Sequence, residues 1–201
     1  MSSPMIRITI QACVLAAASN LMAQLLAEYK SGKPYTIEWV PIIQFIVFTI
    51  INCPPNFLWQ SYLESSFPST YLVPSTTALK AAASSDEKEL DREEKTHEIL
   101  EAKLSIRNTI VKLLMDQTIG AAVNTLLFSL VFAGFRGTTL EQATQIAKQD
   151  FRGLMTAAWK LWPMVSAVNF TLIKSVETRN LVGSLAGMGW NIYLSLCAGE
   201  S

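Results

Sequence analysis

Residues 157–174 read AAWKLWPMVSAVNFTLIK, and they decide how the fold of this chain is understood. The stretch is apolar enough for a membrane span, yet it contains Lys160, Pro163 and Asn169. A charge near the centre of a bilayer costs about 2.5–3.5 kcal/mol even on permissive insertion scales. We therefore expect a helix that kinks at Pro163, because proline lacks an N–H and frees the Trp159 carbonyl. Lys160 can then reach the membrane interface or that freed carbonyl.

The composition of the whole chain is typical of a membrane protein. Of its 201 residues, 50% are hydrophobic and 16% are charged, whereas soluble domains carry about 25% charged residues. Segments long and apolar enough to be helices in lipid are 8–28, 39–63, 113–135, 153–173 and 180–198. We predict an all-α fold, an integral membrane helix bundle with four to five spans. Residues 1–201 are expected to form a single membrane domain in contact with the lipid bilayer.

Between the second and third apolar segments lies a polar insertion at about 68–104. It is first rich in Ser, Thr, Pro and Ala and then dense in mixed charge, with eight acidic residues from Asp86 to Glu101. Such a composition cannot bury much apolar area. We predict a water-exposed linker that leads into a charged helical extension; a partner-binding loop is the alternative.

A short amphipathic helix is predicted after the third apolar segment. Thr139 and Gln142 have the spacing of a capping box. Apolar residues follow at helical intervals, at Leu140, Ala143, Ala147 and Phe151. We expect this helix to be interfacial and to lie along the membrane surface.

Several classes of chemistry find no support in the sequence. The net charge is zero, so no nucleic-acid partner is expected. Cys13, Cys53 and Cys197 are widely spaced within apolar runs and offer no metal-ligand spacing. His97 is the single histidine and is surrounded by glutamates, unlike a catalytic base. We expect no enzyme activity, no catalytic residue, no metal site and no cofactor.

Polar residues within the apolar segments recur at spacings that place them on one helical face. Two interpretations stay open. These polar residues can form hydrogen bonds between helices, or they can line a water-filled path. The candidate pore-lining residues are Asp116, Asn20, Gln24, Asn52, Asn56 and Asn124. In the second interpretation Asp116 biases which ions enter the path, and Gly120 leaves space beside its carboxylate. The alternative role of Asp116 is an ion pair with Lys112.

Small residues provide a further packing expectation. Gly183 and Gly187 form a GxxxG pair of the kind that brings membrane helices close together. A bulky side chain at Gly183 is therefore expected to disturb packing.

Several motifs resemble the Mpv-seventeen / peroxisomal-membrane-protein-twenty-two family of small organelle-membrane proteins. The C-terminal half carries Trp159-x-x-Trp162-Pro163, then Asn169-Phe170, Arg179 and Trp190-Asn191-x-Tyr193-Leu194-Ser195. Further matches are Lys112-x-x-x-Asp116-Gln117 and Pro54 with Trp59, Leu63 and Glu64. The family-motif residues with an expected structural role are Pro54, Trp59, Gln117, Trp159, Trp162, Pro163, Asn169, Phe170, Arg179, Trp190 and Asn191. Ser19-Asn20 departs from the family's Gly-Asp, which removes one acid from the first helix.

The resemblance implies a peroxisomal or mitochondrial inner-membrane protein that acts as a weakly selective pore. The resemblance implies small solutes or ions as partners, and a second copy of the chain is a further expected partner. The alternative is a non-conducting membrane scaffold or tether that assembles through small-residue helix faces.

Overall fold

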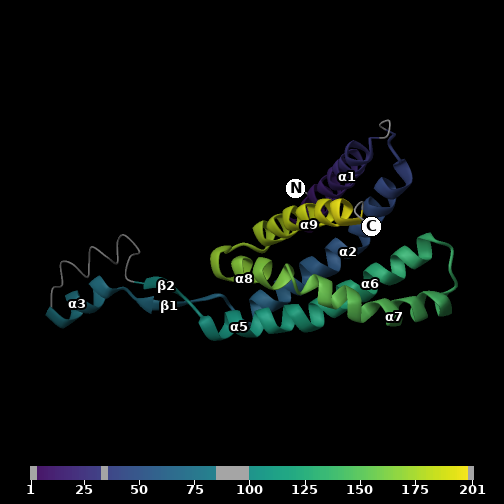
Figure 1. Ribbon diagram of the computed structural model, residues 1–201. Coiled ribbons are helices and arrows are strands. Elements are labelled where there is room, and N and C mark those ends of the chain that lie inside the picture. The colour runs from purple at the N-terminus through teal and green to yellow at the C-terminus, as the bar shows by residue number, and fades with distance from the viewer. Residues whose placement is uncertain (1–3, 33–35, 85–99, 199–201) are drawn as a thin grey trace.

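The computed structural model describes residues 4–32, 36–84 and 100–198, and it is dominated by helices (Figure 1). The first two helices, α1 (Pro4–Ser31) and α2 (Trp39–Ser66), pack against each other. The last helix, α9 (Val176–Ala198), lies along α1 and also contacts α2. Residues from the two ends of the chain therefore form one three-helix layer.

The third apolar segment is one long helix with a wider turn in its middle. It consists of α5 (Ile106–Met115), the π-helical turn η1 (Asp116–Gly120) and α6 (Ala121–Phe135). Phenylalanines join α6 to α2. The rings of Phe45 and Phe132 lie 5.2 Å apart edge to face, and those of Phe48 and Phe128 lie 5.4 Å apart. Such edge-to-face pairs are favourable beyond the area they bury.

The predicted amphipathic helix is α7 (Leu140–Ala158), and it begins with the predicted capping box of Thr139 and Gln142. The chain turns before it at Gly137, whose φ of +73° favours glycine. The helix is longer than expected and packs along α6 through Ala143, Ala147 and Met155, all buried. Small alanines allow the two helix backbones to approach closely.

The expected single helix at 153–173 is wrong. The helical pattern of α7 ends at Ala158, a turn follows, and α8 (Trp162–Leu172) begins a new helix. Pro163 lies in the first turn of α8, where its missing N–H costs nothing because that position has no intrahelical acceptor. The chain therefore breaks ahead of Pro163 instead of kinking at it, and Lys160 is exposed in the turn.

The polar insertion also differs from its prediction at both ends. Strand β1 (Thr70–Pro74) pairs antiparallel with β2 (Leu100–Leu104), from Thr70 opposite Leu104 to Pro74 opposite Leu100, and α3 (Thr76–Ser84) follows β1. This ribbon projects away from the bundle (Figure 1). The strands have the sequences TYLVP and LEAKL, five residues each, which is too brief a pattern to stand out in the sequence. The charged stretch at 85–99 lies outside the described residues.

Three helices are long and apolar enough to cross a membrane in the described part of the chain: Pro4–Ser31, Trp39–Ser66 and Ile106–Phe135. Large apolar side chains on these helices point outward, including Val14 (64% exposed), Ile43 (56%) and Val123 (55%). Apolar groups facing outward from long helices are expected where lipid, not water, surrounds the protein. The predicted all-α membrane helix bundle is confirmed.

Candidate functional site

Asp116 is the centre of a polar cluster between three segments. Its Oδ1 accepts a hydrogen bond from Gln60 Nε2 of α2 at 2.9 Å, and its Oδ2 accepts one from Ser166 Oγ of α8 at 2.7 Å. Gln117 Nε2 also donates to Asp116 Oδ2 at 3.1 Å and to Ser166 Oγ at 3.0 Å. We call Gln60, Asp116, Gln117 and Ser166 the Asp116 cluster. It joins α2, η1 and α8 through the carboxylate.

The π-helical turn places Asp116 opposite the indole of Trp59. A Cβ on Gly120 would lie 2.8 Å from Trp59 Nε1 and 3.2 Å from Asp116 Oδ1. Trp59 Nε1 lies near the carboxylate without a hydrogen bond of normal geometry. The space that the sequence pattern assigned to a path beside Asp116 is therefore filled by Trp59. π-helical turns are rare and are often found at functional sites. The turn at Asp116–Gly120 therefore marks this part of the third span as a candidate functional site.

A second cluster lies at the end of α2 and joins charges of both signs. Lys112 Nζ lies 2.7 Å from Glu64 Oε2, and Arg179 Nη1 contacts the same oxygen. Ser69 accepts hydrogen bonds from Lys112 and from Arg179, and its own Oγ lies 3.0 Å from Glu64 Oε2. We call Glu64, Ser69, Lys112 and Arg179 the Glu64 cluster. The Lys112 and Arg179 side chains are 0% and 1% exposed.

Helix α8 covers the Glu64 cluster. Lys112 Nζ and the Arg179 guanidinium lie 5.1 Å and 5.4 Å from the centre of the Phe170 ring, within range of a cation–π attraction. Arg179 Nε donates to the backbone carbonyls of Asn169 at 3.2 Å and Ile173 at 2.9 Å. The motif residues Asn169, Phe170 and Arg179 are thus brought together. They fix the start of α9 against the ends of α2 and α8.

The Glu64 cluster answers the question about Lys112. The sequence left an ion pair between Lys112 and Asp116 open, because they are four residues apart. The structure pairs Lys112 with Glu64 instead, 48 residues away in the chain. The sequence did not single out this cluster, although an acid at the end of one span and a lysine at the start of another were the available signal.

Two of the candidate pore-lining residues lie at the opposite end of α2 from Asp116. Gln24 Nε2 donates to Asn20 Oδ1 at 2.8 Å and to the Glu38 carbonyl at 2.9 Å, while its Oε1 accepts from the Glu38 N–H at 2.8 Å. Glu38 precedes α2 and Gln60 is near its end, a separation of about 33 Å along the helix. Asn20 and Gln24 therefore fasten the α1–α2 connection and do not join the Asp116 cluster.

The other candidates lie between these ends. Asn52 and Asn56 are half-buried on α2, and Asn52 Oδ1 is buried without a hydrogen-bond partner in the described part of the chain. Asn124 is half-buried on α6. The π-helical turn rotates residues after Gly120 relative to those before Asp116, so the predicted Asp116–Asn124 stripe is not straight. Whether any of these residues lines a path stays a prediction.

The remaining motif residues support packing around the break before α8. Trp159 Nε1 donates to the Gln117 carbonyl at 2.9 Å. Trp162 lies 3.7 Å from where a Cβ on Gly187 would stand, whereas none of the described residues lies within 4 Å of such a Cβ on Gly183. Gly183 therefore has room for a Cβ among the described residues, and the disturbance expected from a bulky side chain there stays a prediction. Pro54 lies within α2, and Trp190 and Asn191 lie on α9.

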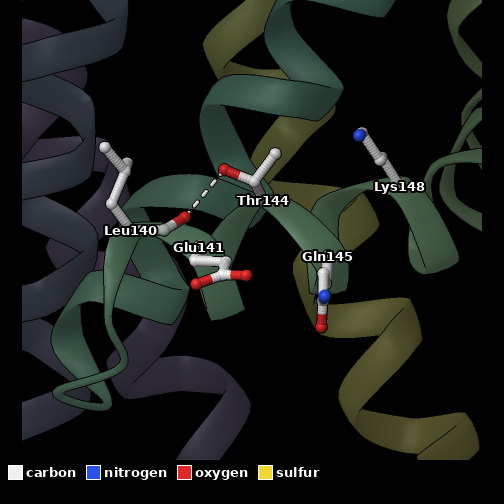
Figure 2. Close-up of a pocket in the computed structure, with 5 residues that line it drawn as sticks. All are labelled: Leu140, Glu141, Thr144, Gln145 and Lys148. Atoms are coloured by element: carbon white, nitrogen blue, oxygen red, sulfur yellow. Dashed lines mark hydrogen bonds between the residues drawn. The ribbon is translucent and has the colours of Figure 1, made fainter.

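Helix α7 carries a polar stripe that the sequence analysis did not single out. Its members recur every three or four residues, and each of them is exposed: Glu141, Gln145, Lys148, Arg152 and Thr156. We call them the α7 stripe. Figure 2 shows a shallow pocket at its N-terminal end, lined by Leu140, Glu141, Thr144, Gln145 and Lys148. The Thr144 hydroxyl there donates to the Leu140 carbonyl at 2.7 Å and so turns inward to its own helix.

Two contacts fix how α7 is aligned with the third span. Trp159 Nε1 donates to the Gln117 carbonyl, and Thr125 Oγ1 lies 3.4 Å from Met155 Sδ. The two residue numbers of each contact add up to 276 and 280, and such a nearly constant sum is typical of two helices that run in opposite directions. In this antiparallel register Arg152 is level with residues 124–128, and Lys148 with residues 128–132. The α7 stripe therefore runs beside the apolar part of α6.

Metal binding finds no support in the geometry. The described residues contain no group of three His, Cys, Asp or Glu side chains placed to hold a metal ion. The clusters found are instead hydrogen-bonded carboxylates with amide, hydroxyl or cationic partners.

Comparison with known proteins bears on the same segments. Residues 133–195, from the end of α6 into α9, match the Mpv17 / PMP22 family. The chain is also similar to the PXMP2/4 family protein 3 of Dictyostelium discoideum, with 24% identity over 197 residues, which cover 98% of this chain and 85% of the relative. No solved structure matches the chain. The resemblance indicated by the sequence motifs is confirmed.

Proposed function

We propose that this chain, a membrane helix bundle resembling the Mpv17 / PMP22 family, forms a weakly selective passage for small solutes or ions. Its proposed location is a peroxisomal or mitochondrial inner membrane. The proposal rests on one observation: a charged helix face runs beside a helix that is apolar enough to span a bilayer. Neither a catalytic arrangement nor a resident cofactor is part of the proposal.

The depth of α7 supports the need for water. The span Ile106–Phe135 is 30 residues long, about 45 Å, which exceeds the roughly 30 Å of hydrocarbon. If the end of this helix at Phe135 marks one membrane interface, the hydrocarbon core extends over about twenty residues, back to about Asp116. Arg152, level with residues 124–128, then lies near mid-membrane. An exposed charge at that depth costs several kcal/mol in lipid, so the α7 face requires water.

The Asp116 and Glu64 clusters support a different role. Their polar atoms are largely bound to partners from neighbouring helices, as expected of interhelical hydrogen bonds that hold a bundle together. They provide the framework that positions α7 against α6. The proposed passage therefore does not depend on the carboxylate of Asp116.

A non-conducting membrane scaffold is the second candidate function, and the open space beside Gly183 on α9 favours it. The open space around this glycine leaves a small-residue face on α9 where a helix from another molecule can approach. A scaffold assembles through that face without conducting.

Solute release from proteoliposomes distinguishes the two functions. The purified full-length chain is reconstituted into liposomes loaded with a labelled small carboxylate together with a labelled large dextran. We expect the carboxylate to leave within the assay while the dextran stays inside, because a narrow hydrated passage excludes the polymer. Liposomes without protein provide the background rate. Protein that is helical by circular dichroism but releases solute only at the background rate would favour the scaffold.

A further inference from the structure

We propose that the α7 stripe lines the passage and makes it favour small anions, including small carboxylates, over cations of similar size. This inference rests on the proposed function and adds the lining residues and the solute class. It differs from the expectation built on Asp116, which assigned a preference for cations.

The stripe occupies one side of α7. The opposite side holds Ala143 and Ala147, which are buried against α6, and Met155 is buried at the edge of the stripe. The intervals of four, three, four and four residues from Glu141 to Thr156 keep the stripe on a single face for the length of the helix. Asp150 is also exposed but falls away from this face, since it is two residues from both Lys148 and Arg152.

The sign of the deep charges is positive. Lys148, level with residues 128–132, lies about 5–11 Å from the α6 end at Phe135. Arg152 lies deeper still, near mid-membrane. Glu141 is the acid of the stripe and stands next to the turn at Gly137, close to the water. An anion that passes Glu141 therefore meets two cations in the deeper part.

No acid of the described chain neutralises these cations. The ion pairs found among the described residues are those of Glu64 with Lys112 and Arg179, and none involves Lys148 or Arg152. Asp116, the acid of the adjacent span, is engaged by Gln60, Gln117 and Ser166. Unpaired cations beside a low-dielectric wall attract anions more strongly than cations in bulk water do. A guanidinium also matches a carboxylate in geometry, because it can donate two parallel hydrogen bonds.

A second copy of the chain supplies the facing wall. Helix α7 packs against α6, and its stripe is left uncovered by the part of the chain that the structure describes. Lipid cannot cover a charged face at this depth. The passage consequently lies between copies, outside the single bundle.

Reversal potentials in a salt gradient test the proposal. The full-length protein is reconstituted in planar bilayers of neutral lipid, with potassium chloride more concentrated on one side. The unaltered protein is expected to reverse on the anion-selective side of zero. The double variant Lys148→Gln with Arg152→Gln keeps polar side chains but removes both charges, so its potential is expected to move to zero or to the cation-selective side. The matched control is Lys80→Gln with Lys103→Gln, which removes two exposed charges from α3 and β2 and leaves the potential unchanged.

Three results would overturn the inference in different ways. Conductance with the same reversal potential in both double variants would remove the α7 stripe from the passage while leaving the proposed function in place. If the protein conducts but amine-reactive crosslinking yields only monomers, the proposal that a second copy of the chain forms the facing wall of the passage is contradicted. Folded protein that never conducts would overturn the proposed function itself.

Discussion

Replacing Glu64 by glutamine is expected to destabilise the bundle by about 3 kcal/mol. Removing one partner of a buried ion pair costs about 3–5 kcal/mol, because the other charge stays buried without compensation. Here two cations, Lys112 and Arg179, depend on the same carboxylate oxygen. The lower end of the range applies, since the Glu64 side chain is 27% exposed and water can approach it. Unfolding of the purified protein in detergent measures the loss.

Two comparisons make this result specific. Glu101→Gln removes an acid from the exposed strand β2 and is expected to leave stability within about 0.5 kcal/mol of the original. Lys112→Met removes one of the buried cations, so Glu64→Gln should cost less in that background than in the unaltered chain. Equal losses in both backgrounds would show that Lys112 and Glu64 are not coupled.

Replacing Gly120 by alanine is expected to cost about 1–3 kcal/mol, the range found for overpacking of a filled interior. The added methyl would meet Trp59 Nε1 at 2.8 Å and Asp116 Oδ1 at 3.2 Å. Both neighbours are held by packing or hydrogen bonds, so the π-helical turn must shift. The measurement is again unfolding in detergent.

The chain offers a matched control at Gly134, also on the third span. In the part of the chain that the structure describes, nothing lies within 4 Å of a Cβ at this position, and alanine is a better helix former than glycine by about 0.5–1 kcal/mol. Gly134→Ala should therefore be neutral or stabilising. Trp59→Phe, which shortens the aromatic group facing Gly120, should reduce the cost of Gly120→Ala. If Gly120→Ala costs as little stability as Gly134→Ala, the close approach of Gly120 to Trp59 is contradicted.

The sequence predicted the features that depend on local pattern. Runs of apolar residues indicated the helices that became α1, α2 and the α5–α6 helix, and the spacing of Thr139 and Gln142 indicated where α7 begins. These signals are reliable because helix length, periodicity and capping are set by nearby residues. The motif around Asn169, Phe170 and Arg179 was recognised by resemblance, without its physical role.

Features that depend on distant contacts could not be predicted in this way. Arg179 meets Glu64 across 115 residues, and no periodic pattern connects them. The break ahead of Pro163 was taken for a kink, since sequence alone does not say whether proline lies inside a helix or begins one. The place of α7 relative to the bilayer stays a prediction, because an amphipathic pattern looks the same on a membrane surface and along a hydrated passage.

Chemical block of solute flux at Arg152 tests the central claim most directly. The Arg152→Cys variant is prepared in a chain whose Cys13, Cys53 and Cys197 are replaced by alanine, reconstituted in liposomes, and treated with a bulky, membrane-impermeant thiol reagent. We predict that modification lowers release of the small carboxylate to the rate of protein-free liposomes, because the attached group fills the passage at mid-depth. The Lys80→Cys variant in the same background should be modified without any loss of flux. Complete modification of the Arg152→Cys variant, verified by mass spectrometry, with unchanged release would contradict a passage along α7.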